Sequence, residues 1–191
     1  MEQDETGLPR PVLIIAIALG VVLAVGVAGV GVYGWWTERT QQQAEQQAEQ
    51  ARRTGPLAMP PVPAPQAQSP DCAKVIAALP QELTVEGQPV PRREIAQPAP
   101  AATVAWGDAE HDPVTVRCGI GSPAELTRTS QLMVVNGVSW FEINEAGNVS
   151  WLAVDRGVRV ALNAPAGIGT GPLQELSDVL KRTLPKRPVF P

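Results

Sequence analysis

The chain has 191 residues, of which 44% are hydrophobic, 18% are charged and 20 are prolines. This length accommodates one ordinary domain with appendages and excludes a large multidomain enzyme. Fifteen basic and 19 acidic residues give a formal net charge of -4, so the chain lacks the excess of positive charge that a nucleic-acid partner would require. The hydrophobic residues are distributed very unevenly along the sequence.

A long apolar segment near the N-terminus predicts a membrane-spanning helix over residues 12–34. No charged residue lies between Pro11 and Trp36, and residues 12–32 consist almost entirely of Val, Ile, Leu, Ala and Gly. A helix of that length extends about 31 Å, which matches the hydrocarbon core of a bilayer. Aromatic residues at positions 33, 35 and 36 follow, where such rings anchor a helix at the lipid headgroups. We therefore expect the lipid bilayer to be a partner of this chain.

A cleavable signal peptide is the alternative interpretation of this segment. The apolar region of a signal peptide usually has only about 7–15 residues, and the small residues Ala24-Val25-Gly26 fall inside the apolar run rather than after it. We therefore expect an uncleaved anchor, with residues 1–11 as a short cytoplasmic tail. The charge bias does not support this orientation, because Arg10 is the only basic residue before the span, whereas three arginines follow it between residues 39 and 53.

A ridge of small residues runs along the predicted membrane helix. Its members recur at every fourth position: Ala16, Gly20, Ala24 and Ala28. Such a ridge lets a second helix approach closely enough for van der Waals packing in lipid, so a membrane-protein partner is one hypothesis. The alternative is that Ala and Gly are simply common in spanning helices.

Residues 35–70 are expected to connect the anchor to a folded domain. The first part, residues 37–53, is rich in helix-forming residues but has no apolar stripe, which predicts a solvated helical stalk. The second part contains five prolines between residues 60 and 70, a composition typical of an extended spacer. The folded domain is then predicted over residues 71–185, with residues 186–191 as a tail.

The first half of the predicted domain contains one helix and two strands. An apolar stripe at helical spacing begins at Cys72 and ends at Leu79, with Asp71 as the expected N-terminal cap. Residues 102–106 and 113–118 are rich in β-prone side chains and lie on either side of a polar turn. They are therefore predicted as two short strands.

Four further strands are predicted as a meander joined by three turns. Asn136-Gly137 separates two β-prone runs, residues 131–135 and 138–143, and is the strongest short hairpin signal. The expected pairs across the three turns are Val135 with Val138, Ile143 with Val149, and Val154 with Val158. Alternation then places one set on the core face, namely Met133, Val135, Val138, Trp140, Leu152, Val154, Val158 and Val160. The opposite face carries Leu132, Val134, Phe141, Ile143, Val149 and Trp151 and is expected to be only partly covered.

A second amphipathic helix is predicted between Pro172 and Pro185. Its apolar stripe consists of Leu173, Leu176, Val179, Leu180 and Leu184. Together, these elements predict an α+β domain in which a mainly antiparallel sheet carries the N- and C-terminal helices on one face. A single transmembrane helix is expected to precede this domain.

The two cysteines, Cys72 and Cys118, indicate the redox compartment of the domain. They form no C-x-x-C pair, and His111 is the only histidine, so a zinc site would lack ligands and no metal is expected. In a domain displayed beyond a membrane helix, we expect these cysteines to form a disulfide that ties the first helix to the sheet. Two buried reduced thiols are the alternative.

Several short motifs occur in order along the predicted domain. They are Ala105-Trp106-Gly107, Val116-Arg117-Cys118-Gly119, Val135-Asn136-Gly137-Val138-Ser139-Trp140 and Asp155-Arg156. With one N-terminal span and an earlier cysteine beside Leu79-Pro80, this pattern resembles the actinobacterial domain-of-unknown-function family 3515. The resemblance covers about residues 71–185 and implies a membrane-anchored envelope protein with an exported domain. It implies no activity, and it leaves Trp106, Gly107, Arg117, Asn136, Gly137, Trp140, Asp155 and Arg156 without an assigned role.

Few residues are candidates for chemistry. Asp108, Glu110, His111 and Asp112 form a polar cluster that could hold a cation or move protons, but their spacing does not match a calcium loop, and a solvated turn explains them equally well. Residues 167–171 are rich in glycine but lack the final glycine of a dinucleotide-binding loop. We therefore expect a helix start there and no cofactor.

One face of the predicted meander is the better candidate for binding a partner. Phe141 and Trp151 would be cross-strand neighbours on that face, with Leu132 near them, and partly exposed aromatic side chains are typical of protein interfaces. The alternative is that the strands over residues 102–106 and 114–118 cover this face.

The sequence as a whole favours a membrane-tethered, extracytoplasmic accessory or binding domain of the cell envelope, without catalysis. The N-terminus is expected in the cytoplasm and the C-terminal domain outside. An envelope hydrolase or carbohydrate-binding enzyme is the alternative, with carboxylates near Asp108–Asp112, or Asp155, as acid or base. Two carboxylates converging at about 5–10 Å in a cleft would favour that alternative.

Overall fold

A computed structural model describes residues 45–50, 53–145 and 147–190 of the chain. Residues 45–50 are helical, which is the conformation predicted for the stalk. In the part of the chain that the structure describes, neither the stalk nor the helices of the domain have the length and hydrophobicity needed to cross a bilayer. The predicted span over residues 12–34 lies outside the described residues, and so does its ridge of Ala16, Gly20, Ala24 and Ala28.

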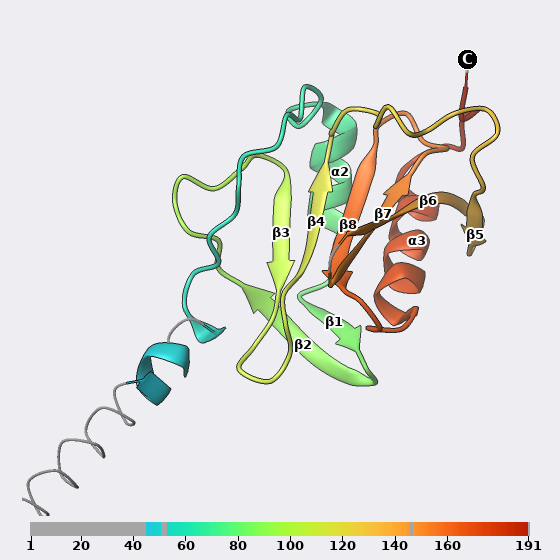
Figure 1. Cartoon of the computed structure of the whole chain (residues 1–191). Coiled ribbons are helices and arrows are strands. Elements are labelled where there is room, and N and C mark those ends of the chain that lie inside the picture. Colours follow the sequence, from blue (N-terminus) through green and yellow to red (C-terminus); the bar gives the residue numbers. More distant parts are fainter. Residues whose placement is uncertain (1–44, 51–52, 146, 191) are drawn as a thin grey trace, which may run out of the picture. The chain divides into compact units, whose positions relative to one another are not determined.

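An antiparallel sheet organises the unit formed by residues 50–191. Its eight described strands are β1 (Glu82–Val85), β2 (Gln88–Arg93), β3 (Thr103–Trp106), β4 (Val114–Cys118), β5 (Met133–Val135), β6 (Val138–Glu145), β7 (Asn148–Ala153) and β8 (Val160–Pro165). They lie in the order β1-β2-β3-β4-β8-β7-β6-β5, so two meanders meet where β4 pairs with β8 (Figure 1). The predicted meander over residues 131–160 is thereby confirmed in its connectivity.

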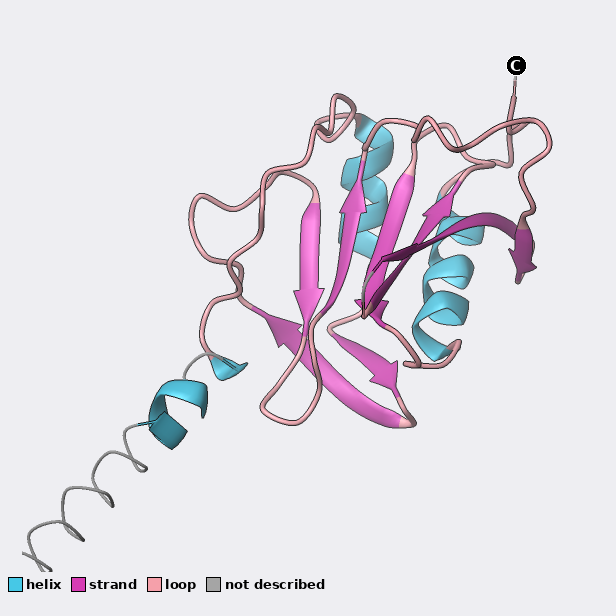
Figure 2. Ribbon diagram, in the orientation of Figure 1, coloured by secondary structure: helices cyan, strands magenta, loops and turns pink. Residues whose placement is uncertain are grey.

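Two helices, α2 (Pro70–Ala78) and α3 (Gly171–Thr183), lie on the same side of the strand layer (Figure 2). The predicted apolar stripe of α3 is fully buried: Leu173, Leu176, Val179, Leu180 and Leu184 are each at most 3% exposed. These side chains form one core with inward-facing residues of the sheet and with Cys72 and Val75 of α2. The α+β architecture with an antiparallel sheet is therefore as predicted.

The disulfide between Cys72 and Cys118 is present and joins α2 to β4. Both cysteines are completely buried. The cap of α2, however, is Ser69 rather than the expected Asp71, because the Ser69 hydroxyl accepts the backbone N–H of Cys72 at 3.2 Å. Pro70 is well suited to the first helical turn, so the helix begins before Asp71 and places that carboxylate in its first turn.

The sequence patterns do not predict the hairpin of β1 and β2. Pro89 and Pro91 lie within β2 and lack the N–H groups of a ladder, which argues against a strand in sequence-based reasoning. Both nevertheless pair with β1, opposite Thr84 and Glu82. β2 joins the rest of the sheet only through its last two residues, which pair with β3.

The register of β7 differs from the prediction by one residue. Val135 lies opposite Val138 as expected, but Ile143 pairs with Ser150 instead of Val149. The expected pair of Val154 and Val158 is also wrong, because Ala153 pairs with Val160 and residues 154–159 form a loop. Strand β7 has apolar residues on both faces, so alternation alone does not determine its register.

This shift exchanges the two faces of β7. Val149 and Trp151 belong to the main core beneath the helices, whereas Leu152 and Val154 lie in a small cluster on the opposite face. Met133, predicted in the core, is 36% exposed because β5 is a short strand at the edge of the sheet.

Residues 57–69, which we call the strap, lie against the sheet instead of forming a free spacer. Leu57 forms a parallel β-bridge with Ile95, and the backbone N–H of Gln66 donates to the carbonyl of Gly119 at 3.1 Å. At Gly119, whose φ is +86°, a Cβ would lie only 2.3 Å from the backbone nitrogen of Ala67, so only glycine permits this approach. The folded unit therefore begins before the predicted boundary at residue 71.

The C-terminal residues also pack on the folded unit, although residues 186–191 were predicted as a tail. The backbone N–H of Arg187 donates to the carbonyl of Asp155 at 2.9 Å. The carbonyl of Val189 accepts a hydrogen bond from Arg159 at 3.3 Å, and the Val189 side chain packs on the small cluster.

Candidate functional site

The face of the sheet opposite α2 and α3, which we call the outer face, carries the candidate site. Along β4, Val114, Val116 and Cys118 point into the core beneath the helices. Side chains alternate along a strand, so Thr115 and Arg117 point to the outer face. Strand β4 is paired on both sides, with β3 and with β8, which fixes the backbone at these positions.

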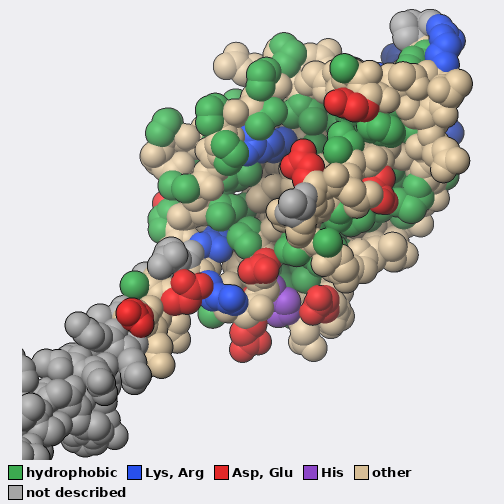
Figure 3. Space-filling view, in the orientation of Figure 1, with side chains coloured by type: hydrophobic (Ala, Val, Ile, Leu, Met, Phe, Trp, Pro, Cys, Tyr) green, Lys and Arg blue, Asp and Glu red, His purple; other side chains and the backbone are tan. Residues whose placement is uncertain are grey.

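Two different coverings lie over the outer face. Toward β6 and β7, the outer face is covered by the small cluster mentioned above, which we call the satellite cluster. It consists of Leu152, Val154 and Ala161 with Ile120, Leu126, Leu132, Phe141 and Val189. Toward β3 and β4, the strap covers the outer face. In the space-filling view of this side, hydrophobic side chains are spread over the surface, and acidic side chains gather around the single histidine at its lower edge (Figure 3).

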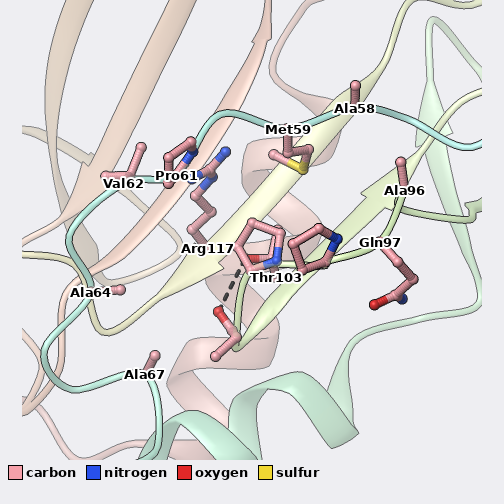
Figure 4. A pocket seen from close by; sticks show the side chains of 13 residues that line it. Ala58, Met59, Pro61, Val62, Ala64, Ala67, Ala96, Gln97, Thr103 and Arg117 are labelled. Atoms are coloured by element: carbon pink, nitrogen blue, oxygen red, sulfur yellow. Dashed lines mark hydrogen bonds between the residues drawn. The ribbon is translucent and has the colours of Figure 1, made fainter.

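A pocket of about 550 Å³ lies between the strap and the sheet, and we call it the strap pocket. The strap contributes Ala58, Met59, Pro61, Val62, Ala64 and Ala67, and the connection between β2 and β3 contributes Ala96, Gln97, Pro98, Pro100 and Ala101. Thr103 and Arg117 complete the wall from the sheet (Figure 4). A volume of this size lies within the usual range for small-molecule sites.

Arg117 is the charged residue among the thirteen described residues that line the strap pocket. It is 7% exposed, and its guanidinium extends toward Pro61 and Met59 of the strap (Figure 4). No carboxylate or hydrogen-bond acceptor among the described residues pairs with this side chain. Burial lowers the pKa of Arg117 from its ordinary value, but an arginine remains protonated in proteins. The pocket therefore holds an uncompensated positive charge in apolar surroundings.

A second hollow, of about 570 Å³, shares Ala58 and Met59 with the strap pocket. Its sheet wall is polar, with Thr115 of β4 opposite Asn163 of β8. The Ser150 hydroxyl donates to the Asn163 side-chain carbonyl at 2.5 Å, so this acceptor already has a partner within the sheet. Asp112, an exposed carboxylate at its edge, is the charged residue among the described residues that line the second hollow.

Asp155 and Arg156 form a buried ion pair in the loop between β7 and β8. Asp155 Oδ1 lies 2.8 Å from Arg156 Nη1, and the two side chains are 1% and 2% exposed. The guanidinium also donates to the carbonyls of Asp155 at 2.9 Å and Gly137 at 3.3 Å. This pair connects the loop to the β5–β6 turn, and its burial prevents Asp155 from reaching a substrate.

The polar cluster at residues 108–112 forms a hydrogen-bonded turn, and its residues 110–112 line a hollow of about 140 Å³ together with Glu86. The Asp108 carboxylate accepts the backbone N–H groups of Glu110 at 2.8 Å and His111 at 2.7 Å, and it lies 3.0 Å from the His111 ring nitrogen Nδ1. Burial acts to raise the pKa of Asp108, but the hydrogen bonds from His111 and Glu110 outweigh it, so the pKa is lowered. Among the described residues, no group of three potential metal ligands is found, here or elsewhere.

The two sets of candidate carboxylates lie at opposite ends of the sheet. The loop containing Asp108 precedes β4, whereas Asp155 precedes β8, and β4 and β8 are antiparallel. Cys118, at the end of β4, pairs with Val160 at the start of β8. Asp108 and Asp155 therefore cannot act as an acid and a base on one bond.

A known protein family matches most of the chain. A model of the family described as Protein of unknown function (DUF3515) matches residues 17–189. The chain belongs to this family. No curated protein and no solved structure matches the chain. Membership of DUF3515 agrees with the resemblance found in the sequence and assigns no activity to the chain.

Most of the DUF3515-like motif residues have structural roles in this chain. Trp106 is fully buried and donates through Nε1 to the carbonyl of Pro80 at 3.2 Å. Gly107 follows it and donates its backbone N–H to Pro91 at 3.1 Å. Trp140 is also fully buried, and its Nε1 donates to the Ser177 hydroxyl at 2.9 Å. These contacts join β1–β3 and α3 to the core.

Asn136 and Gly137 form the tight turn between β5 and β6. Their φ angles are 48° and 84°, which is the left-handed backbone that a two-residue hairpin turn requires. The Asn136 side-chain amide also donates to Asp178 of α3 at 3.0 Å. Among the motif residues, only Arg117 lines the strap pocket.

The predicted partner surface of Phe141, Trp151 and Leu132 does not form. Phe141 lies opposite Leu152, whereas Trp151 lies opposite Glu142 on the core side, is 7% exposed and donates to the Glu142 carboxylate at 3.0 Å. Phe141 and Leu132 pack instead in the satellite cluster. The one-residue shift of β7 is the physical reason, because it moves Trp151 to the opposite face.

The strap pocket could not be predicted from the sequence, because its two walls are formed by segments that are distant in the chain. The proline-rich strap resembles a spacer, and the alanines and prolines of residues 96–101 have no periodicity. The available signal is the alternation in β4, where an arginine interrupts a strand of otherwise small or apolar residues. A charge at that position requires either a partner or a ligand.

Proposed function

We propose that this chain is a single-pass, membrane-anchored binding domain on the extracytoplasmic side of the cell envelope, with an accessory rather than a catalytic role. The observation that carries the proposal is the buried Cys72–Cys118 disulfide. Structural disulfides persist in oxidising compartments and are rare in the cytosol. The disulfide therefore supports export of the domain, although the distribution of arginines around residues 12–34 does not.

The sequence preceding the domain supports the anchor in this proposal. Residues 12–34 are uncharged and long enough to span a bilayer, and residues 37–53 follow with the composition of a solvated helical stalk. The strap then enters the domain and contributes one wall of a pocket. Such an arrangement would tether the domain that contains the strap pocket to the membrane.

The geometry of the carboxylates supports binding over hydrolysis. Asp155 is buried against Arg156, and Asp108 is held by the N–H groups of its own turn at the other end of the sheet. Neither of these two carboxylates lines the strap pocket. Glu86, Glu110 and Asp112 line a separate hollow beside His111, but its volume of about 140 Å³ is smaller than that of usual small-molecule sites. Within the described residues, the strap pocket offers a charged group in a cavity of ligand size, which is the arrangement of a binding site.

Protease accessibility in intact cells tests the proposed location. The full chain carries an epitope tag at each end, and protease is added to cells from which the outer barriers have been removed but whose cytoplasmic membrane is intact. We expect loss of the C-terminal tag and protection of the N-terminal tag. Before reduction, Cys72 and Cys118 should also resist alkylation, as measured by nonreducing mass spectrometry.

The controls separate location from folding. A cytosolic protein must remain intact in the same cells, and detergent lysis must expose the N-terminal tag. Since a folded domain can resist protease, the stalk between residues 37 and 53 provides the cleavage site. A protected C-terminal tag together with two alkylated thiols in intact cells would contradict the proposal.

A further inference from the structure

The Arg117 side chain is largely buried, and its guanidinium faces the strap pocket without a protein acceptor among the described residues. Arg117 is 7% exposed, and no acceptor among the described residues compensates its charge. Burying a charge without a partner is strongly unfavourable, and such groups are normally paired or solvated. An arginine in this state is therefore placed to meet a negative charge from outside the chain.

The surroundings of Arg117 indicate what the rest of the ligand must be. The strap wall consists of alanine, proline, valine and methionine side chains, and no acidic residue is among the described residues of the pocket lining. The other polar side chains that line the pocket are Thr103, opposite Arg117 across β3 and β4, and Gln97. The Thr103 hydroxyl is already bonded to the carbonyl of Ala101 at 3.1 Å. This lining favours an apolar body rather than a sugar or a nucleotide.

We propose that the strap pocket binds an anionic amphiphile, with a carboxylate or phosphate head on Arg117 and an apolar chain against the strap. A guanidinium makes two parallel hydrogen bonds to either head group. The pocket volume of about 550 Å³ accommodates an apolar chain of moderate length. This inference deepens the proposed function, because it names the ligand class of the extracytoplasmic binding domain.

The strap connects this site to the membrane-proximal part of the chain. Residues 58–64 form one wall of the pocket, and they directly follow the predicted stalk in sequence. Ligand binding would therefore fix the segment through which the domain is tethered. An amphiphile is also a class of molecule that partitions into membranes, and the proposed function tethers the domain to a membrane.

Calorimetric titration of the full chain in phosphatidylcholine nanodiscs tests the ligand class. The probes are octyl phosphate and octanoate, octanol as the analogue without charge, and inorganic phosphate as the analogue without a chain. Empty nanodiscs provide the blank for partitioning into lipid. We expect at least one anionic amphiphile to bind about tenfold or more tightly than octanol and inorganic phosphate do.

Variants of the pocket test the role of Arg117. Arg117→Met should abolish the preference for octyl phosphate over octanol, and Arg117→Lys should weaken binding several-fold because an ammonium cannot make the paired hydrogen bonds. Ala64→Phe, which fills the apolar part while retaining the charge, should also weaken binding. Arg128→Gln removes an exposed arginine outside the pocket lining and is the matched control. It should leave the affinity unchanged.

Three results would overturn the inference. They are binding of no probe, binding of both anionic amphiphiles no tighter than that of octanol, and unchanged affinity for the anionic amphiphile in Arg117→Met. Nanodiscs that contain phosphatidylglycerol distinguish two sources of the same head-group chemistry. Competition with octyl phosphate by these nanodiscs assigns the site to a bilayer lipid, and absence of competition assigns it to a soluble amphiphile.

The binding assay and the protease assay test the ligand class and the location independently. Binding in nanodiscs does not depend on the side of the membrane that the domain occupies in cells. Cytosolic exposure of the domain would remove the proposed location and leave the ligand site intact. Loss of probe binding would remove the ligand class and leave the location intact.

Discussion

On the helix-covered face of the sheet, β4 contributes Val114, Val116 and Cys118, each at most 1% exposed, whereas on the outer face the same strand contributes Thr115 and Arg117. The first set packs against α2, α3 and the disulfide in one continuous core. The second set lies beneath the strap, beside two hollows of about 550 and 570 Å³. Close packing stabilises the fold, and incomplete packing leaves room for a ligand. The comparison indicates that close packing is concentrated on the helix-covered face, and the binding proposed above uses the outer face.

The largest expected effect on the helix-covered face comes from removing the disulfide. The variant Cys72→Ala/Cys118→Ala opens a link between residues 46 positions apart. In the chain-entropy model, a loop of this size contributes about 4 kcal/mol to the free energy of unfolding. We expect a loss near that value in urea unfolding of the full chain in detergent, followed by far-ultraviolet circular dichroism. Addition of reductant to the wild-type chain should reproduce the loss, and a much smaller loss in both experiments would contradict the assigned role.

Matched leucine truncations compare the two faces directly. Leu180 of α3 is fully buried in the main core, whereas Leu132 is only partly buried in the satellite cluster. Leu180→Ala should lower the free energy of unfolding by about 3 kcal/mol, because it leaves a cavity in a packed core. Leu132→Ala should lower it by about 1 kcal/mol, since less apolar area is buried there. Equal losses in urea unfolding would show that the outer face is packed as closely as the core.

The β5–β6 turn tests the contribution of backbone conformation to stability, which is common to both faces of the sheet. Gly137 has a φ of 84° with open space where a Cβ would lie, so Gly137→Ala introduces backbone strain without a clash. Left-handed backbone costs an ordinary residue about 1–2 kcal/mol, and we expect a loss of that size in the free energy of unfolding. Gly121→Ala is the matched control, because Gly121 has equal space and no positive φ. It should have little effect, and similar losses in the two variants would exclude backbone strain as the cause.

The elements with strong local signals could be predicted, and the relations between distant segments could not. Asn136-Gly137 specifies a tight turn through its backbone preference, and the apolar stripe of residues 173–184 specifies a helix face. The register of β7 could not be predicted, because Trp151 and Leu152 are both apolar and either could face the core. A hydrophobic pattern determines a register only when one face is polar.

The candidate site was only partly accessible from the sequence for the same reason. Arg117 could be recognised as part of a motif, but its burial depends on Pro61 and Met59, more than fifty positions earlier in the chain. A proline-rich segment has the same composition whether it is a spacer or a wall. Only its pairing with Ile95 and Gly119 distinguishes the two.

Arg117→Met should raise the free energy of unfolding, whereas the core substitutions should lower it. It replaces a largely buried arginine that has no protein acceptor among the described residues by an apolar side chain of similar length. We therefore expect the free energy of unfolding without ligand to rise, by about 1 kcal/mol at most. An arginine that supports the fold would give a loss instead. Urea unfolding of the wild type and the variant, with Arg128→Gln as the control outside the pocket, distinguishes these outcomes. A loss of stability in Arg117→Met would assign Arg117 to the fold and remove the division between the two faces at this position.

The smallest expected effect lies in the turn at residues 108–112, which belongs to neither covering. The pKa of Asp108 is lowered in the folded chain. Its ionised carboxylate therefore stabilises the fold at pH values above its unfolded pKa of about 3.9. This contribution is lost as the pH falls through the lower pKa of the folded chain. Asp108→Asn should therefore cost about 0.5 kcal/mol at pH 7, a value reduced by solvent screening. The difference between the two chains should shrink below about pH 4.

Urea unfolding at pH 7, 5 and 3 measures this difference, with Asp112→Asn as the control in the same turn. Asp112 accepts no hydrogen bond from the other described residues, so its replacement should cost less at pH 7 than Asp108→Asn does. A difference between wild type and Asp108→Asn that grows as the pH falls would reverse the sign of the effect. The turn would then be stabilised by a protonated Asp108, and the hydrogen bonds from Glu110 and His111 could not be what holds it.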